Sequence, residues 1–498
     1  KERKNKMTSA CIAYFIGADI DVNTSYIFNG VVTADPKTQA TTFVFDSFER
    51  LHTSVEDFKM CPDVYSKLNQ LGTQDLNDSE QIFEYFTALY NWYAHNITRI
   101  YDRFDLHMAI DLAFHSVLSF TFEGEFIKKG WADIMIIGDT RCGKGFVADR
   151  LSALFGVGEI ISGDNITMAG LVGGLQQYGS QWNVTWGKLP LNDTGLVVVD
   201  EASEIKSSEW TKLSRIRSEG IAEINKILTQ KTSARTRTIF ISNPPFKTIS
   251  NYSYGIQSIK DVVETAEDIA RFDYVLIVAS NEVGCVVINS KKTRVAPLYD
   301  TELENLLIRW VWSRQPNDIK FSQEAIELIF EQSIRLASQY SIEIPLIQGE
   351  NIRIKLAKIA IMVAGRLFSN KNDGQILYVK RCHVKSALIF LRMIYGKPSA
   401  GYLALSKLHK NQYAAVGAKS FSKIESYCES FVDSKDLYKG LLENNNLTVQ
   451  RISEYLNQPQ EIAREIISKL LQNECLIYGR GQSYTKTPAF TNWLRNKI

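Results

Sequence analysis

The chain has 498 residues, of which 45% are hydrophobic and 22% charged, a composition typical of an ordinary soluble globular protein. Its length exceeds what one compact core can hold and predicts about three domains. The formal net charge is only +2, which excludes a general positive field, so any nucleic-acid-binding surface must be local.

The cysteines and the first residues indicate the cellular setting. The seven cysteines are scattered, with no Cys-x-x-Cys pair and no histidine at zinc spacing, so we expect reduced thiols in a cytoplasmic protein. Residues 1–20 are basic and then apolar, as in a signal peptide, but Asp19 and Asp21 interrupt the short apolar stretch. A buried strand is predicted there instead. No run approaches the ~18 apolar residues of a membrane helix, so we expect no membrane partner.

Residues 1–118 predict a mixed α+β N-terminal domain of unknown role. Short β-like pieces such as 41–48 (TTFVFDSF) precede a stretch, 79–104, whose aromatic residues recur at helical spacing. Such aromatics can stack on bases, but at this spacing they more often fill a core, and we predict a core role.

Residues 119–295 alternate apolar strand-like runs with amphipathic segments, which predicts an α/β domain with a parallel sheet. The predicted strands are 133–137, 196–200, 238–242 and 274–279. Residues 296–396 predict a helical lid without strands, in which 322–340 and 352–368 carry apolar faces. Residues 397–435 predict a linker, because Gly, Pro and Ser break the helical pattern at its start.

Residues 436–498 predict a winged helix. Three short helices, at 436–445, 448–457 and 459–474, precede two β-like pieces around a glycine turn within 475–487. Arg464 and Lys469 would point away from the apolar face of the third helix, and Arg480 would lie on the wing. Such a domain can bind DNA or serve as a plain protein contact, and we predict DNA contact.

Residues 138–145 (GDTRCGKG) follow the first predicted strand of the α/β domain. Glycines let successive backbone N–H groups point inward, and a lysine at the start of the next helix meets the β- and γ-phosphates of a nucleotide. The string predicts an ATP-binding loop made of Gly138, Asp139, Thr140, Arg141, Cys142, Gly143, Lys144 and Gly145. Gly145 stands where a Ser or Thr normally gives its hydroxyl to Mg²⁺, and a water could replace that ligand at some cost in affinity.

Three further strings supply candidate catalytic groups. Four apolar residues precede Asp200 and Glu201, which would place Asp200 near the metal and Glu201 where it polarises an attacking water. In isolation this string also fits a buried strand that ends in an acidic turn. Asn243 ends another predicted strand, where its amide would orient the water, although an asparagine can also simply form the turn.

Arg271 precedes the last predicted strand of the domain. An arginine there can ion-pair within its own subunit, or reach the γ-phosphate bound to a neighbouring subunit as an arginine finger.

In this order, the four pieces resemble the AAA+ core of the minichromosome maintenance (MCM) helicases. The phosphate loop of that family begins Gly-Asp, and its finger motif is Ser-Arg-Phe-Asp, matched here by 270–273 except at Ala270. Residues 234–236 (Ala-Arg-Thr) and the Gly-rich segment 169–195 have counterparts in the family, and 351–361 is similar to its sensor-2 helix, which nominates Arg353. The resemblance covers about 130–370. The N-terminal region lacks the family's zinc cysteines, so the likeness is nearest to compact MCM-like helicases of bacterial mobile elements or phages.

The resemblance implies a homo-oligomeric ring, usually a hexamer, with ATP and Mg²⁺ at each subunit boundary. Lys144, Asp200, Glu201 and Asn243 would act from one subunit, and Arg271 and Arg353 from the next. A hairpin between Asn225 and Ala234 carries Lys226 and Lys231, which would contact single-stranded DNA in the channel. Cations of the preceding helical segment are assigned instead to a solvated face.

These observations predict an ATP-driven DNA helicase or translocase acting in replication of a mobile element. The alternative is a nucleotide-gated, DNA-binding replication initiator with weak ATPase activity. A third class, AAA+ transcription activators, is disfavoured because its GAFTGA loop is absent from the sequence.

Overall fold

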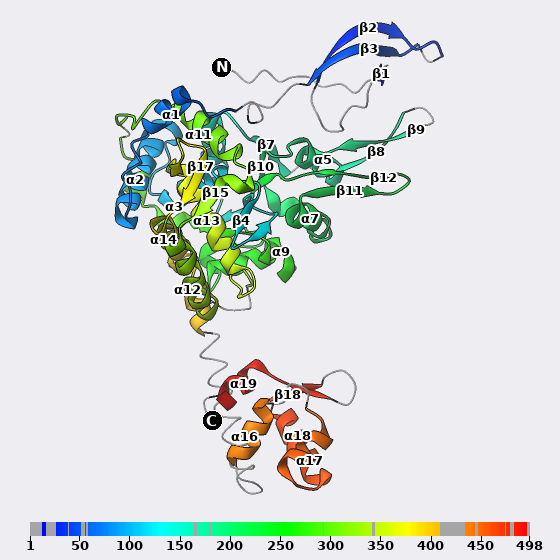
Figure 1. Cartoon of the computed structure of the whole chain (residues 1–498), viewed down its shortest axis with the longest axis vertical. Helices are drawn as coiled ribbons and strands as arrows, with labels where there is room; N and C mark the ends of the chain where they lie inside the picture. Colours follow the sequence, from blue (N-terminus) through cyan, green and yellow to red (C-terminus); the bar gives the residue numbers. More distant parts are fainter. Residues whose placement is uncertain are drawn as a thin grey trace. The chain divides into compact units, whose positions relative to one another are not determined.

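The computed structural model describes residues 12–15, 26–37, 39–50, 55, 58–163, 167–178, 181–291, 293–340, 344–408, 434–443, 447–473, 475–478 and 483–495. The chain divides into two compact units, Lys1–Tyr402 and Leu403–Ile498 (Figure 1). In the part of the chain that the structure describes, no helix combines the length and apolarity needed to cross a bilayer.

A five-stranded sheet forms the centre of the first unit, and its strands follow the order β14-β6-β13-β10-β7. Every pair of neighbours is parallel. β6, β13 and β14 are buried along their whole length, because a parallel sheet is covered on both faces. The strands are β6 (Asp133–Gly138), β7 (Glu159–Ser162), β10 (Leu196–Asp200), β13 (Arg237–Ser242) and β14 (Tyr274–Val278). All four predicted strands are confirmed to within one residue at either end. β7 was not predicted, because it is only partly buried and lacks a long apolar run.

The N-terminal helices belong to the same unit as this sheet, so the predicted domain boundary at residue 118 is wrong. They are α1 (Pro62–Asn69), α2 (Ser79–Trp92), the π-helix η1 (Tyr93–Thr98) and α3 (Phe104–Phe114). α3 packs against β13 and β14. Phe86, Trp92 and Tyr93 are buried, as predicted for the aromatic residues of this stretch.

A buried ionic cluster ties α3 to the lid. The guanidinium of Arg366 lies 3.3 Å from Asp111 on α3 and 3.0 Å from Glu304, and all three side chains are fully buried. The Tyr93 hydroxyl also donates to Asp111, at 3.0 Å. Burial raises the pKa of Asp111 to about 7, against the opposing charge of Arg366. Contacts of this kind make residues 79–114 part of the α/β body rather than a separate domain.

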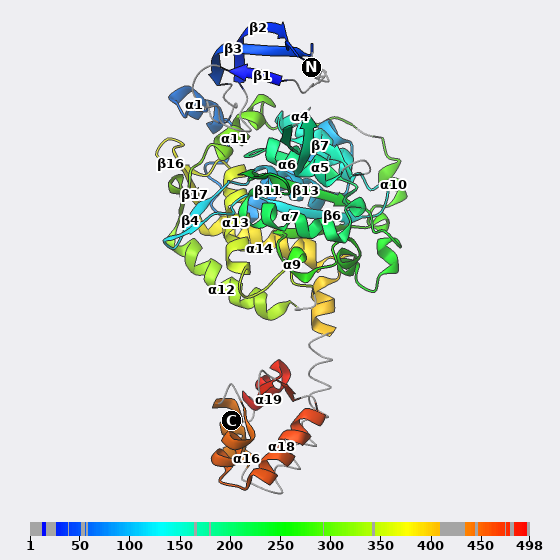
Figure 2. The ribbon, with the colours of Figure 1, turned by 90° about the vertical axis from the view of Figure 1, so that its right-hand side faces the viewer.

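The lid contains strands that the sequence did not predict. Its helices are α11 (Glu302–Trp312), α12 (Gln323–Gln339), α13 (Ile352–Arg366) and α14 (Arg381–Gly396), and the last two lie side by side (Figures 1 and 2). A three-stranded sheet joins β15 (Ile319–Phe321), β17 (Ile376–Val379) and β16 (Asn370–Lys371). The prediction of no strands is therefore wrong, because strands of two to four residues leave no periodic signal.

A small N-terminal sheet has the order β1-β3-β2 and consists of β1 (Ile12–Phe15), β2 (Tyr26–Ala34) and β3 (Thr41–Arg50). The predicted strand near the N-terminus is present, but the prediction that it is buried is wrong. Tyr14 is 54% exposed, because β1 is the edge of this small sheet.

The predicted linker also begins later than expected. Residues up to Tyr402 belong to the first unit, and 402–408 are helical. The stretch 409–433 lies outside the described residues.

Between residues 434 and 486, the described part of the C-terminal unit forms three helices followed by a hairpin. These are α16 (Ser434–Glu443), α17 (Val449–Leu456), α18 (Gln460–Gln472) and the antiparallel strands β18 (Leu476–Tyr478) and β19 (Tyr484–Lys486), with α19 (Pro488–Arg495) after them. On α18, Ile466 and Leu470 are buried while Arg464 and Lys469 are exposed, as predicted. α19 was not predicted. Arg480 lies outside the described residues, and the winged-helix assignment stays a prediction.

Candidate nucleotide-binding site

The phosphate loop joins the end of β6 to α4 (Lys144–Phe155). A Cβ on Gly138 would overlap the carbonyl of Val278, because β14 pairs with β6 at this residue. Arg141 and Gly143 have φ values of 62° and 82°, in the left-handed region, and turn the chain so that the helix begins directly at Lys144. Thr140 and Cys142 complete the turn. The first N–H groups of a helix have no intrahelical partner, which makes this end of α4 a suitable site for phosphate.

Lys144 is buried between the loop and β13. Its Nζ donates to the carbonyls of Gly138 and Asp139, each at 2.7 Å, and to Oδ1 of Asn243 at 2.9 Å. Burial lowers the pKa of Lys144 to about 8, although Cys142 and Asp200 act in the opposite direction. The structure therefore brings together two residues that the sequence predicted for the same site.

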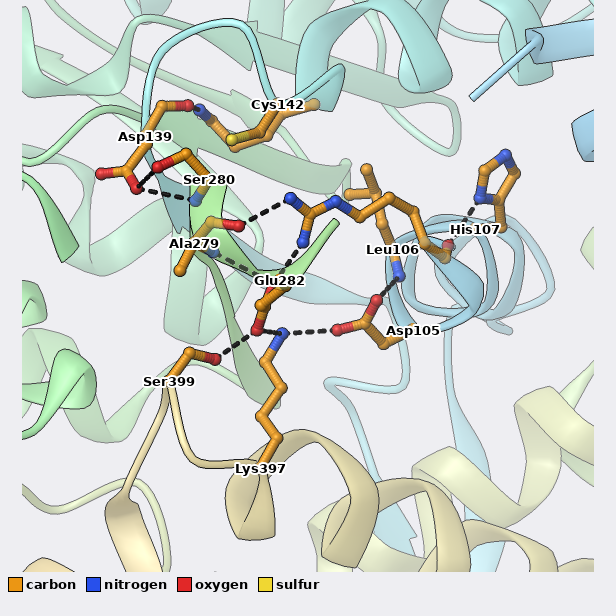
Figure 3. Close-up of polar contacts among 12 residues, drawn as sticks. Asp105, Leu106, His107, Asp139, Cys142, Ala279, Ser280, Glu282, Lys397 and Ser399 are labelled. Atoms are coloured by element: carbon orange, nitrogen blue, oxygen red, sulfur yellow. Dashed lines mark hydrogen bonds and ion pairs between the residues drawn. The ribbon is translucent and has the colours of Figure 1, made fainter. Parts of the chain in front are cut away.

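Asp139 was predicted to bind the nucleotide, but its contacts assign it to bracing the loop. One carboxylate oxygen accepts from the Ile249 backbone N–H at 2.8 Å. The other accepts from the Ser280 N–H and hydroxyl at 2.8 and 2.9 Å (Figure 3). Its own N–H donates to Val278. Burial alone would raise the pKa of Asp139, but the hydrogen bonds from Ile249 and Ser280 hold it below its usual value. The carboxylate is thus engaged within the protein, and the assignment of Asp139 to the nucleotide-binding loop stays a prediction.

Asp200 and Glu201 lie at the end of β10, next to this loop. Glu201 has a φ of 59°, and its carboxylate accepts from the Ser162 hydroxyl at 3.0 Å. A Cβ on Gly145 would overlap Oδ2 of Asp200 and lie 3.2 Å from its Cγ. The carboxylate of Asp200 therefore stands against the first turn of α4, where the hydroxyl of a usual phosphate loop would lie.

Few protein groups near the phosphate loop could coordinate a bound Mg²⁺. Among the described residues, no group of three or more His, Cys, Asp or Glu side chains could hold a metal ion. Mg²⁺ commonly binds one or two carboxylates together with nucleotide phosphates and waters. The single carboxylate of Asp200 beside a phosphate-binding turn is consistent with this mode of Mg²⁺ coordination.

Arg271 lies at the opposite edge of the sheet. Tyr274, three residues after it, pairs with Ile134 at the start of β6, while the phosphate loop follows the end of that strand. The length of β6 from Ile134 to the start of the phosphate loop is about 13 Å. The guanidinium of Arg271 lies 2.6 Å from Asp268, and the Arg271 side chain is 24% exposed. Arg271 is therefore remote from Lys144 of its own subunit, and in a single chain it ion-pairs with its own helix.

Arg353 lies on the same side as Arg271. Its guanidinium is 3.7 Å from Glu125 and 5.3 Å from the ring centroid of Phe330. Lys358 lies further along α13, and its Nζ is 2.5 Å from the carboxylate of Asp273. Asp273 follows Arg271 by two residues. The helix that carries Arg353 therefore contacts the segment that follows Arg271.

The predicted DNA-contacting lysines lie on a hairpin of β11 (Ile221–Asn225) and β12 (Thr229–Ser233). This hairpin lies beside a second one, β8 (Gly173–Tyr178) with β9 (Gln181–Trp186) (Figure 1). Lys226 is exposed in the turn, and Lys231 is 54% exposed and 3.3 Å from Glu223. Arg217, on the preceding helix α7 (Ser207–Glu219), is instead buried and paired with Asp133 at 2.9 Å.

Two residues beside the loop were missed because their segment was assigned to another domain. A Cβ on Gly143 would lie 3.1 Å from Cδ1 of Ile100, so Ile100 covers the turn. Arg103 pairs with Glu282 and donates to the Ala279 carbonyl at 2.6 Å; Glu282 in turn contacts Lys397, at 2.9 Å (Figure 3). The only sequence signal was the break in helical spacing between 92 and 104.

Residues 78–283 match the family model described as the MCM P-loop domain. The match begins at the capping residue of α2 and extends past Arg271, so it includes the helices that pack on the sheet as well as the four motifs. Together with the central parallel sheet, the match supports a P-loop core of the MCM type in this part of the chain.

Proposed function

We propose that this chain is an ATP-dependent DNA helicase or translocase that works as a ring of identical subunits, six by the family resemblance, in replication of a mobile element. One observation carries the proposal. Lys144, Asn243 and Asp200 meet at the carboxyl edge of the sheet, whereas Arg271 and Arg353 lie at the other side of the unit. A site divided in this way is completed only by a second copy of the chain.

Each residue has a defined task in this account. Lys144 and the first N–H groups of α4 bind the triphosphate, and Asn243 orients the attacking water. Glu201 accepts the proton of that water, and Arg271 of the neighbouring subunit stabilises charge on the transferred phosphoryl group. Mg²⁺, when bound through Asp200, would neutralise phosphate charge.

DNA contact would come from two regions of the chain. Lys226 and Lys231 project on a narrow hairpin and would follow the phosphates of a single strand without reading its sequence. Arg464 and Lys469 are exposed on α18, and together with Arg480 they would contact duplex DNA at an origin.

The test combines ATPase and unwinding assays over a range of protein concentrations. We expect wild type to unwind a forked DNA, with ATPase activity per subunit that rises as rings assemble and when single-stranded DNA is added. Lys144→Ala should abolish both activities. Arg335→Ala, which removes an exposed helix arginine paired with Glu331, is the control and should keep both.

Two outcomes would count against the proposal. If ATPase activity per subunit is independent of concentration, the site is not shared between subunits. If wild type binds ATP and DNA but never unwinds the fork, the protein is the nucleotide-gated initiator instead.

A further inference from the structure

Asp200 and Glu201 are enclosed by two glycines. Gly145 lies in the first turn of α4, and a Cβ there would overlap Oδ2 of Asp200. Gly163 follows β7, and a Cβ there would overlap the main-chain carbonyl of Glu201 and lie 2.8 Å from that of Asp200. The end of β10 therefore fits its surroundings only because both neighbouring positions lack a side chain.

A hydrogen bond holds the carboxylate of Asp200 in its present position. Its Oδ1 accepts the backbone N–H of Glu201 at 3.0 Å, and Glu201 itself holds a left-handed conformation that ordinary residues seldom adopt. Turning the side chain away from α4 would break this hydrogen bond. A side chain at position 145 would thus displace the Asp200 carboxylate from its present place beside α4.

We propose that Gly145 is a positioning residue that lets the Asp200 carboxylate take over the metal-binding task of the missing hydroxyl. In the usual phosphate loop, a Ser or Thr after the lysine binds Mg²⁺. Here the same place beside Lys144 is filled by a charged oxygen from another strand. This inference rests on the proposed nucleotide site and explains why the loop ends Gly-Lys-Gly.

This inference predicts that introducing the residue usual in phosphate loops, a Ser or Thr after the lysine, weakens Mg²⁺ binding in this protein. Restoring the usual residue with Gly145→Ser should harm Mg²⁺-dependent binding, because the new Cβ displaces a charged ligand to add a neutral one. Gly145→Ala should do the same, since the Cβ alone causes the overlap. Gly396→Ala is the matched control, because a Cβ there meets nothing within 4 Å.

The experiment measures the affinity of the full chain for a fluorescent ATP analogue, with Mg²⁺ and with EDTA, and direct Mn²⁺ binding by electron paramagnetic resonance. Changes around a metal ligand typically cost about 10- to 100-fold in metal affinity, and we expect that loss for both Gly145 variants. Binding in EDTA should stay within about twofold of wild type, which also confirms that the variants are folded. Unchanged or tighter Mg²⁺-dependent binding by Gly145→Ser would overturn the inference.

A double-variant cycle separates this role from a general defect in the loop. If Gly145 acts only through Asp200, Gly145→Ser should have no further effect in an Asp200→Ala background. An equal loss in both backgrounds, or an Asp200→Ala variant that keeps wild-type Mn²⁺ binding, would refute the inference while leaving nucleotide binding intact. A wild type that binds no nucleotide under either condition would refute the proposed function as well.

Discussion

Because the amine of Lys144 is buried, we predict that ATP binding weakens as pH rises above about 8, well below the pH at which an ordinary lysine loses its charge. The pKa of Lys144 is about 8, so the free protein loses this charge as pH rises through 8, whereas bound phosphates would keep the amine protonated. Affinity should therefore be fully present below the pKa and decline above it. From pH 7.5 to 9.5 the protonated fraction falls from about 0.8 to about 0.03, which corresponds to a rise in Kd of about 25-fold. A lysine with the ordinary pKa would change Kd by less than about 1.2-fold over this range.

The assay is equilibrium binding of a fluorescent ATP analogue at fixed ionic strength and Mg²⁺ concentration. Cys142→Ala is the control for the neighbouring thiol: the decline should persist in that variant and begin at a somewhat lower pH, because Cys142 raises the pKa of Lys144. Lys144→Ala should bind weakly with a flat profile. A flat wild-type profile up to pH 9.5 would refute the reasoning, since it would mean that Lys144 keeps its charge in the free protein.

Three further predictions concern stability and DNA. Asp139→Ala removes an acceptor of three hydrogen bonds and should lower the free energy of unfolding by about 2–4 kcal/mol in urea titrations, whereas Asp149→Ala, on the exposed face of α4, should change it by less than about 0.5 kcal/mol. Arg217→Met removes one of the two cations that pair with the buried carboxylate of Asp133, the other being Lys129, and should cost about 1.5–3 kcal/mol, against at most about 1 kcal/mol for the exposed ion pairs lost in Arg215→Met; equal costs would contradict the structural role. Lys226→Ala should leave DNA-independent ATPase activity unchanged and reduce the slope of log affinity for single-stranded DNA against log salt by at least about 0.7.

Long apolar runs and a compact loop motif were readable from the sequence. β6, β10, β13 and β14 are buried along nearly their whole length, so each carries at least three consecutive apolar residues, and these runs made the strands predictable. The glycines and the lysine within residues 138–145 are the residue types that a phosphate-binding turn requires, so this turn could be predicted from the local sequence. The structure places Lys144 and Asn243 together as expected.

Features that depend on distant partners could not be read in this way. The assignment of α3 to the α/β body depends on Arg366, more than 250 residues along the chain, and no local pattern indicates that contact. The contacts by which Asp139 braces the loop could not be predicted, because its partners, Ile249 and Ser280, come from two other segments. Likewise, Gly145 appeared to be a defect until the position of Asp200 gave the physical reason for it.

Mixing two inactive variants tests the central claim most directly. Lys144→Ala lacks a phosphate-binding group and Arg271→Ala lacks the finger, so each alone should have almost no ATPase activity. In an equimolar mixture, about a quarter of the subunit boundaries would join an intact loop to an intact finger, so activity should recover to about a quarter of wild type. No recovery in mixtures that form rings, or full activity of Arg271→Ala alone, would contradict a site shared between neighbouring copies.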